Sequence, residues 1–155
     1  MPLSPLCSDC KQPKSRLFWC QNCNSKRFQQ NFYKWTSGNE LIDKIIQNAQ
    51  LKARDKNEII EWIPYDRLRN VLFLARGGFS TVYKAIWLDG YINKWEKNQW
   101  CRFSNSLNEE DYKNAKAKDV KAPLDGSEKG KIDVVLKSLN NSTNIDPDFL
   151  NEVIT

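Results

Sequence analysis

The sequence contains no histidine. This absence excludes a Ser-His-Asp triad, a Cys-His nucleophile and any histidine metal ligand within the chain. No apolar run approaches the length that a bilayer-spanning helix needs, and residues 1–5 show neither the basic segment nor the apolar core of a secretory signal. We therefore expect no membrane segment and a cytoplasmic location.

The 155 residues suffice for one ordinary domain, or for a small module beside part of a larger one. With 40% hydrophobic and 28% charged residues, the composition allows a globular fold. The positive charge is concentrated near the start: residues 1–35 carry a formal charge of +5, whereas basic and acidic side chains balance over residues 36–155. The overall pI of about 8.9 therefore reflects the first segment.

Four of the five cysteines form two C-x-x-C pairs that are close in sequence. Paired C-x-x-C motifs are typical of a tetrahedral Zn²⁺ site, and in a cytosolic chain they favour a metal over disulfides. The alternative is a set of unrelated reduced thiols. We predict a small zinc-ribbon-like segment over residues 1–35 with the ligands Cys7, Cys10, Cys20 and Cys23.

The same segment interleaves basic residues with aromatic ones, a pattern that nucleic-acid-binding surfaces share. The other interpretation is a solvated basic face around an aromatic mini-core. We prefer this second interpretation, because six cations without a second module are weak evidence for a surface that binds nucleic acid. Nucleic acid is therefore not an expected partner.

Residues 36–65 read as a leader helix followed by a linker. The sequence from Ser37 to Glu40 has the S-x-x-E form of a capping box, and apolar residues then recur at helical spacing up to Ala49. We predict a helix over residues 38–53, which the linker joins to the segment that starts at residue 66.

A glycine-containing turn lies at the centre of the remaining chain. Apolar residues 71–74 lead into Gly77 and Gly78, and strand-forming residues around Val82 follow. This pattern predicts a strand, a turn and a second strand. Glycine lets the backbone of such a turn approach a ligand closely, and its amides can face phosphate oxygens.

Residues 89–131 read as an insert with two parts. The aromatic first part predicts a hairpin that turns at Lys97-Asn98, whereas the charged residues 108–131 predict a mobile loop. The lone Cys101 is interpreted as a structural thiol.

After this predicted loop, we predict a strand over residues 132–139, which contains Lys137 among apolar residues. An ammonium there needs either an anionic partner or room to snorkel to the strand edge. Asp146 and Pro147 predict the start of a helix that carries Glu152. Taken alone, Glu152 could be a solvated helix residue.

These features, in this order, resemble the N-terminal lobe of a protein kinase domain over residues 66–155. The kinase pattern G-x-G-x-x-G-x-V would lie on Ala75, Gly77, Ser80 and Val82, and residues 134–137 resemble the V-A-I-K strand. The leader is similar to those in the expanded kinase families of arbuscular mycorrhizal fungi. The resemblance implies an α+β fold, with an antiparallel sheet and the start of the kinase αC helix after the zinc-ribbon-like segment and the leader helix.

The resemblance also implies ATP as the ligand, with Mg²⁺ in a complete kinase. Lys137 would contact the α- and β-phosphates, and Glu152 would hold Lys137 in position. The residues that would cover the nucleotide are Ala75, Arg76, Gly77, Gly78, Phe79, Ser80 and Val82.

No H-R-D-type or D-F-G motif occurs in the 155 residues, so we expect no catalytic residue in this chain. The sequence thus indicates the ATP-binding portion of a protein kinase, a fragment that by itself transfers no phosphoryl group to a protein hydroxyl. The alternative is a non-enzymatic zinc adaptor that contacts nucleic acid or protein through residues 1–35.

Overall fold

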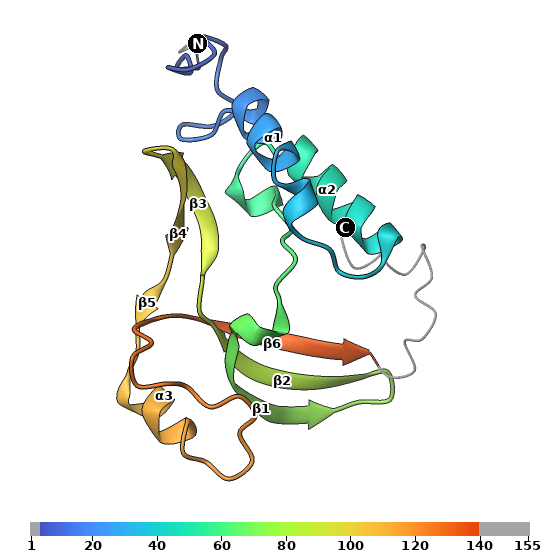
Figure 1. Ribbon diagram of the computed structural model, residues 1–155, viewed down its shortest axis with the longest axis vertical. Coiled ribbons are helices and arrows are strands. Elements are labelled where there is room, and N and C mark those ends of the chain that lie inside the picture. The colour runs from blue at the N-terminus through green and yellow to red at the C-terminus, as the bar shows by residue number, and fades with distance from the viewer. Residues whose placement is uncertain (1–3, 140–155) are drawn as a thin grey trace. The chain divides into compact units, whose positions relative to one another are not determined.

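The computed structural model describes residues 4–139 (Figure 1). This part of the chain forms two compact units. The first, here called the cysteine unit, comprises the residues up to Trp62 together with Ile92–Cys101. The second, the sheet unit, comprises Ile63–Tyr91 and the residues from Arg102 onward. The cysteine unit thus includes the leader helix and part of the region expected to be an insert, in addition to residues 1–35.

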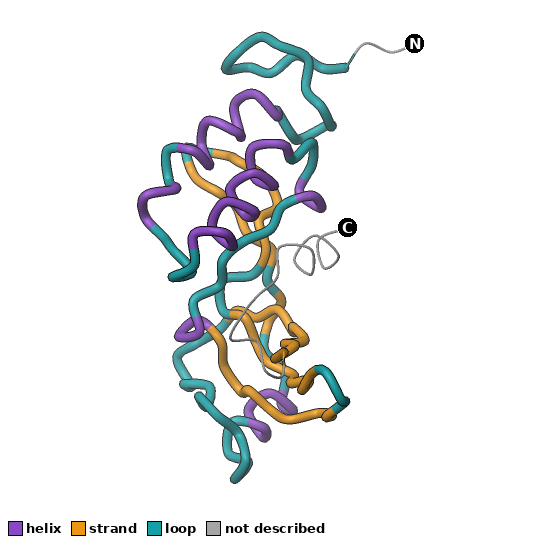
Figure 2. Tube along the Cα trace, turned by 90° about the vertical axis from the view of Figure 1, so that its right-hand side faces the viewer, coloured by secondary structure: helices purple, strands orange, loops and turns teal. Residues whose placement is uncertain are grey.

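Two helices, α1 (Gln21–Gln29) and α2 (Glu40–Lys52), run side by side in the cysteine unit (Figure 2). Short 3₁₀ turns follow each of them, η1 (Phe32–Lys34) and η2 (Lys56–Glu58). Hydrogen bonds attach the first helix and the preceding turn to the end of α2: Ser25 Oγ donates to the Leu51 carbonyl at 2.6 Å, and Trp19 Nε1 donates to the Ala53 carbonyl at 3.1 Å.

The leader helix is confirmed as α2, but its cap differs from the expected capping box. Asn39 is the N-cap, and its side chain accepts hydrogen bonds from the N–H groups of Leu41 and Ile42. Ser37 lies outside the helix, where its hydroxyl hydrogen-bonds to Asp43. An asparagine next to the first helical residue satisfies the first N–H groups directly, so Ser37 is not needed there.

The hairpin of strands β3 (Tyr91–Glu96) and β4 (Gln99–Phe103) turns at Lys97 and Asn98, as predicted. These two residues have φ angles of 51° and 59°, and positive φ at both central residues is what a type I′ turn requires. Most of the hairpin belongs to the cysteine unit. Its Ile92 is buried in the same core as Trp19, Phe28 and Ala53.

The sheet unit contains a four-stranded antiparallel sheet in the order β1-β2-β6-β5 (Figure 1). The strands are β1 (Leu68–Arg76), β2 (Ser80–Trp87), β6 (Gly130–Leu139) and the short β5 (Asn105–Ser106), and the 3₁₀ turn η3 (Tyr65–Arg67) precedes them. An α+β fold with an antiparallel sheet was the expectation, and it is confirmed. The buried core of this unit is Leu68, Val71, Ala85 and Trp87, against which Val134 and Leu136 pack.

The expectation of a mobile loop over residues 108–131 is wrong. The segment contains helix α3 (Glu109–Asn114), and the buried side chain of Asn70 ties it to β1. Asn70 Nδ2 donates to the Asp111 carbonyl at 2.7 Å, and Asn70 Oδ1 accepts from the Leu124 N–H at 3.0 Å. Asn70 adopts a φ of 50° at a bulge in β1, a conformation that asparagine tolerates better than most residues.

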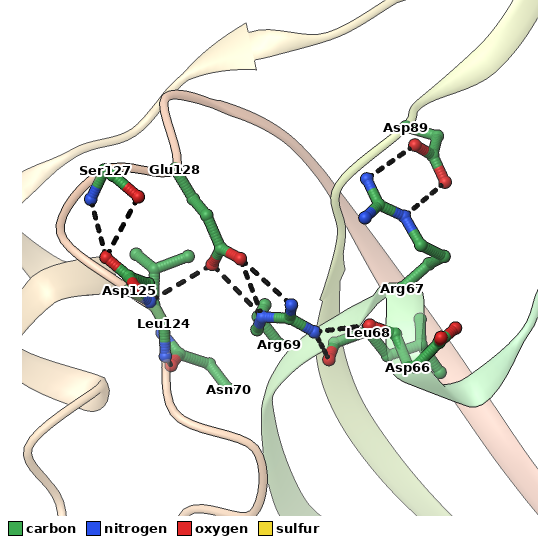
Figure 3. Close-up of polar contacts among 10 residues, drawn as sticks. All are labelled: Asp66, Arg67, Leu68, Arg69, Asn70, Asp89, Leu124, Asp125, Ser127 and Glu128. Carbon is green, nitrogen blue, oxygen red and sulfur yellow. Dashed lines mark hydrogen bonds and ion pairs between the residues drawn. The ribbon is translucent and has the colours of Figure 1, made fainter.

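Ion pairs also connect this segment to β1 and bridge one end of the β1–β2 pair (Figure 3). Arg69 on β1 pairs with Glu128 at 3.0 Å, and Arg67, the last residue of η3 before β1, forms a two-bonded pair with Asp89 after β2. A third pair is almost fully buried: Lys131 Nζ lies 2.7 Å from Asp111 Oδ2. Because these charged side chains satisfy one another, residues 108–131 are ordered although they contain few large apolar residues.

None of the helices in the described part of the chain combines the length and the apolar character that crossing a bilayer requires.

Candidate metal centre and candidate nucleotide face

The four cysteines predicted as ligands come together in the cysteine unit. The Sγ atoms of Cys7, Cys10, Cys20 and Cys23 all lie within 4.8 Å of one another. Cys7 and Cys23 are 3.8 Å apart, and Cys10 and Cys20 are 3.6 Å apart. Four thiolates at about 2.3 Å from a tetrahedral Zn²⁺ lie about 3.8 Å from one another, so the cluster has the size that such an ion needs. The arrangement fits a metal ion held by four cysteines.

Local structure explains how the two pairs converge. The first pair lies in a tight turn, in which the Cys7 N–H donates to the Gln12 carbonyl and the Lys11 N–H donates to the Cys7 carbonyl, both at 2.9 Å. The second pair opens helix α1, with Cys20 as its N-cap. A helix N-terminus stabilises negative charge, which suits thiolates. The second pair thus lies at the N-terminus of a helix, which the sequence analysis did not predict.

The surroundings of the four thiols differ. The backbone N–H of Gln12 lowers the pKa of Cys10 to about 6. Burial raises the pKa of Cys20, and it raises the pKa of Cys23 to about 12. Burial of these two thiols thus favours their protonated form when no cation is bound. A divalent cation bound to the cluster would hold all four as thiolates, because a coordinating thiol loses its proton.

On the sheet unit, three of the residues predicted to contact ATP form one row across adjacent strands. Ala75 on β1 lies opposite Val82 on β2, and Val82 lies opposite Lys137 on β6. Directly opposed residues of an antiparallel sheet project from the same face. A bulge between Phe73 and Ala75 leaves one extra residue in β1 and keeps Ala75 in this row.

The neighbouring row contributes residues that the sequence interpretation did not include. Lys84 lies between Leu72 on β1 and Val135 on β6, and it shares the face of Val82 because two positions separate them along β2. Val135 is 67% exposed. The face therefore combines exposed apolar side chains with two lysines. The alternation of Val82 and Lys84 along a strand was the signal that could have shown this.

The predicted glycine turn joins β1 to β2. The Gly77 N–H donates to the Ser80 carbonyl at 2.8 Å and so closes the turn. In the described part of the chain, the N–H groups of Gly78 and Phe79 make no hydrogen bond and remain available. The side chain of Phe79 is 90% exposed at the tip.

The two glycines of the turn are not required by the fold of the chain itself. A Cβ added to Gly78 would meet no atom within 4 Å, and one added to Gly77 would meet only the Ser80 carbonyl oxygen at 3.7 Å. Neither residue has a positive φ. Gly77 and Gly78 thus leave open space beside the backbone, and the turn conformation does not require glycine at either position.

The remaining predicted site residues divide between exposed positions and positions outside the described chain. Arg76 ends β1, Ser80 begins β2, and Lys137 is exposed, with no carboxylate paired to it within residues 4–139. Glu152, the residue predicted to orient Lys137, and the helix predicted to carry it lie outside the described residues.

No known family model matches the chain. No curated protein and no solved structure matches it at a significant level either. The geometry and chemistry of the two sites are thus the basis for assigning a function.

Proposed function

We propose that the sheet unit is the ATP-binding portion of a protein kinase. The observation that carries this proposal is the row of Ala75, Val82 and Lys137 across three adjacent strands. These residues come from the two motifs that resemble kinase sequences, and a long insert separates the motifs in the chain. Their meeting on one face supports a shared ligand.

The chemistry of the face suits a nucleotide. Val82 and Val135 offer apolar surface for a base, and the ammonium groups of Lys84 and Lys137 offer positive charge for phosphates. The available N–H groups of Gly78 and Phe79 add neutral donors at one end of the face. A ligand that is flat and apolar at one end and strongly anionic at the other matches this set.

In a complete kinase the reaction would be transfer of the ATP γ-phosphoryl group to a protein hydroxyl, with Mg²⁺ beside the phosphates. Lys137 would position the α- and β-phosphates, Glu152 would orient Lys137, and residues 75–82 would cover the nucleotide. The 155 residues contain no motif for a catalytic base or for Mg²⁺ ligands. The chain by itself is therefore expected to bind ATP without transferring phosphate.

A calorimetric titration of the whole chain with ATP tests this proposal. Replacing Lys137 by methionine removes the ammonium, and the loss of a charge-assisted hydrogen bond should weaken binding by about tenfold or more. The matched control is Lys113→Met on α3, an exposed lysine outside the face. Equal effects of the two substitutions, or no ATP binding at all, would contradict the proposal.

We also propose that the four-cysteine cluster holds a structural Zn²⁺. The sulfur–sulfur separations of 3.6 and 3.8 Å support it, as does the all-cysteine ligand set, which closes the coordination sphere. A closed set of four protein ligands serves folding and leaves no position for a substrate. The role of a zinc adaptor that contacts other molecules through residues 1–35 remains the alternative function of this unit.

A further inference from the structure

The β3–β4 hairpin lies between β2 and β6 in the chain, yet its residues 92–101 belong to the cysteine unit. Ile92 is buried in the core of this unit, and Trp100 packs against that core. Its ring stacks on Phe28 at a centroid distance of 4.7 Å and on Trp19 at 5.7 Å. Phe28 and Trp19 are both buried, so the hairpin completes the core of this unit. Trp95 in turn meets Trp100 edge to face at 5.0 Å.

Arg27 connects this hairpin to the turn that carries Cys7 and Cys10. This turn, which is closed by the bond from the Cys7 N–H to the Gln12 carbonyl, is here called the cysteine turn. One guanidinium nitrogen donates to Asp9, which lies between Cys7 and Cys10, at 2.7 Å. The other terminal nitrogen donates to Asn24 Oδ1 at 2.7 Å, and the guanidinium carbon lies 4.6 Å from the centre of the Trp95 ring. The Arg27 side chain is only 18% exposed. A single side chain thus contacts the cysteine turn, helix α1 and the hairpin.

Backbone hydrogen bonds close the cysteine turn on itself. It contains no helix or long strand, however, and its Leu6 side chain is 62% exposed. The buried hydrophobic cluster of the unit consists of four residues, which is small for a unit of this size. A metal ion that joins the turn to the start of α1 would therefore be the main constraint on the turn, because α1 itself is already attached to α2. Asp9 and Arg27 carry that constraint to Trp95.

We propose that metal occupancy of the four-cysteine cluster controls whether the β3–β4 hairpin is docked. This inference rests on the proposed Zn²⁺ site. With the ion bound, α1 and the cysteine turn present Phe28, Trp19 and Arg27 to the hairpin. Without it, the cysteine turn is released from α1, Arg27 loses the Asp9 contact that holds it over Trp95, and the hairpin undocks from the core that α1 and α2 retain. The connection between β2 and β6 then lengthens by the residues that were docked.

Thermodynamic reciprocity gives the proposal a second consequence. If the bound ion favours docking, docking must favour ion binding by the same factor. Removing Trp100 should therefore weaken Zn²⁺ binding, although this residue is not a ligand. Arg27→Lys keeps the charge but loses the fork that reaches Asp9 and Asn24 together, and it should have a smaller effect in the same direction.

The experiment is hydrogen–deuterium exchange with mass spectrometry on the whole chain, with and without a chelator. Zinc content is measured in the same samples by elemental mass spectrometry. Peptides over residues 92–101 report the hairpin, and peptides from β1, β2 and β6 serve as the internal reference. Zn²⁺ affinity is measured by competition with a chromogenic chelator for Trp100→Ala and for the control Phe103→Ala. Phe103 stacks on Tyr91, and both belong to the sheet unit, so the control removes an aromatic ring from the same strand but not a residue of the cysteine unit.

The proposal predicts that chelation removes the protection of residues 92–101 while the reference strands keep theirs. It also predicts that Trp100→Ala weakens Zn²⁺ binding by about fivefold or more and that Phe103→Ala leaves it unchanged. Stoichiometric zinc with the same hairpin protection in both states would overturn this inference and leave the Zn²⁺ site intact. Chains that bind no zinc would overturn both. Loss of protection in every strand on chelation would overturn the claim that the effect is confined to the hairpin.

Discussion

Val82 and Lys137 lie directly opposite each other on antiparallel strands, so that an apolar side chain and an ammonium project from the same face of the sheet. Neither residue reveals this relationship by its place in the sequence. The pairing of β2 with β6 creates it, and Ala75 extends the row to β1. The proposed nucleotide face depends on this register, because a slip of one residue would turn Lys137 to the opposite face.

Substitutions in the glycine turn should affect ATP binding but should not destabilise the fold. Replacing Gly77 and Gly78 together by alanine should not lower the free energy of unfolding, because the added Cβ atoms meet no close contact and alanine restricts the unfolded chain more than glycine does. ATP binding should weaken, since the same atoms would stand between the backbone and the phosphates. Chemical denaturation and calorimetric titration measure the two quantities.

Gly126→Ala is the control for this substitution, because Gly126 is also uncrowded and also lies in the sheet unit. It should leave both stability and ATP affinity unchanged. An ATP affinity of the double variant equal to that of the control would show that no ligand approaches the turn backbone.

The metal centre predicts one Zn²⁺ per chain, lost when a ligand is replaced. Cys20→Ser should abolish stoichiometric binding and lower the melting temperature of the cysteine unit, because the ion joins the cysteine turn to α1. Elemental analysis and thermal unfolding monitored by tryptophan fluorescence test this. Cys101→Ser is the matched control, since Cys101 is a cysteine outside the cluster. Retention of one ion by both variants would argue against the four-cysteine site.

The buried pair of Lys131 and Asp111 predicts a large effect on stability. The two side chains are 7% and 5% exposed, and Lys131→Met would leave the Asp111 carboxylate buried without its cation. Breaking a buried pair on one side costs about 3–5 kcal/mol of unfolding free energy. Adding Asp111→Asn should recover part of this loss, because the amide oxygen still accepts from the Asn108 N–H. Urea denaturation measures the free energy of unfolding of each variant. As a control, Lys129→Met replaces an exposed neighbouring lysine and should lower this free energy only slightly.

The same pair predicts a pH dependence at alkaline pH. Burial opposes the charge of Lys131, but hydrogen bonds to Asp111 and Asp133 outweigh it and raise the pKa of this lysine above its ordinary 10.5. A folded pKa above the unfolded one means that the contribution is complete below the unfolded pKa. It is lost as the pH rises through the folded pKa. Urea midpoints that fall as the pH rises from about 10.5 toward the raised pKa of Lys131 in the native chain, but not in the double variant, would confirm this dependence. Parallel curves for the two chains would contradict it.

Features encoded over short stretches of sequence were predictable. The hairpin turn at Lys97-Asn98, the leader helix and the strand that contains Lys137 follow from local turn chemistry and periodicity. The four cysteines were predictable as a cluster because their spacing alone constrains them. The position of the helix cap was not, since Ser37 and Asn39 are both good caps and the structure selects the second.

Features that depend on distant partners were not predictable. The charged segment before β6 reads as a mobile loop because its order comes largely from pairs such as Lys131–Asp111 and Arg69–Glu128. Within residues 108–131, Leu124 is the one buried apolar residue. The stacking of Trp100 on Phe28 is another such pair. Single residues gave no sign that these groups meet, because only the folded chain brings them together.

The nucleotide face is tested most directly by a two-dimensional amide NMR titration of the whole chain with ATP at millimolar concentration. If ATP binds this face, the amide signals of Ala75, Gly78, Phe79, Val82 and Lys137 will shift with its concentration. Lys137→Met will suppress these shifts, whereas Lys113→Met will not. Unchanged resonances on β1, β2 and β6, or shifts that persist undiminished in Lys137→Met, would contradict the proposed nucleotide face.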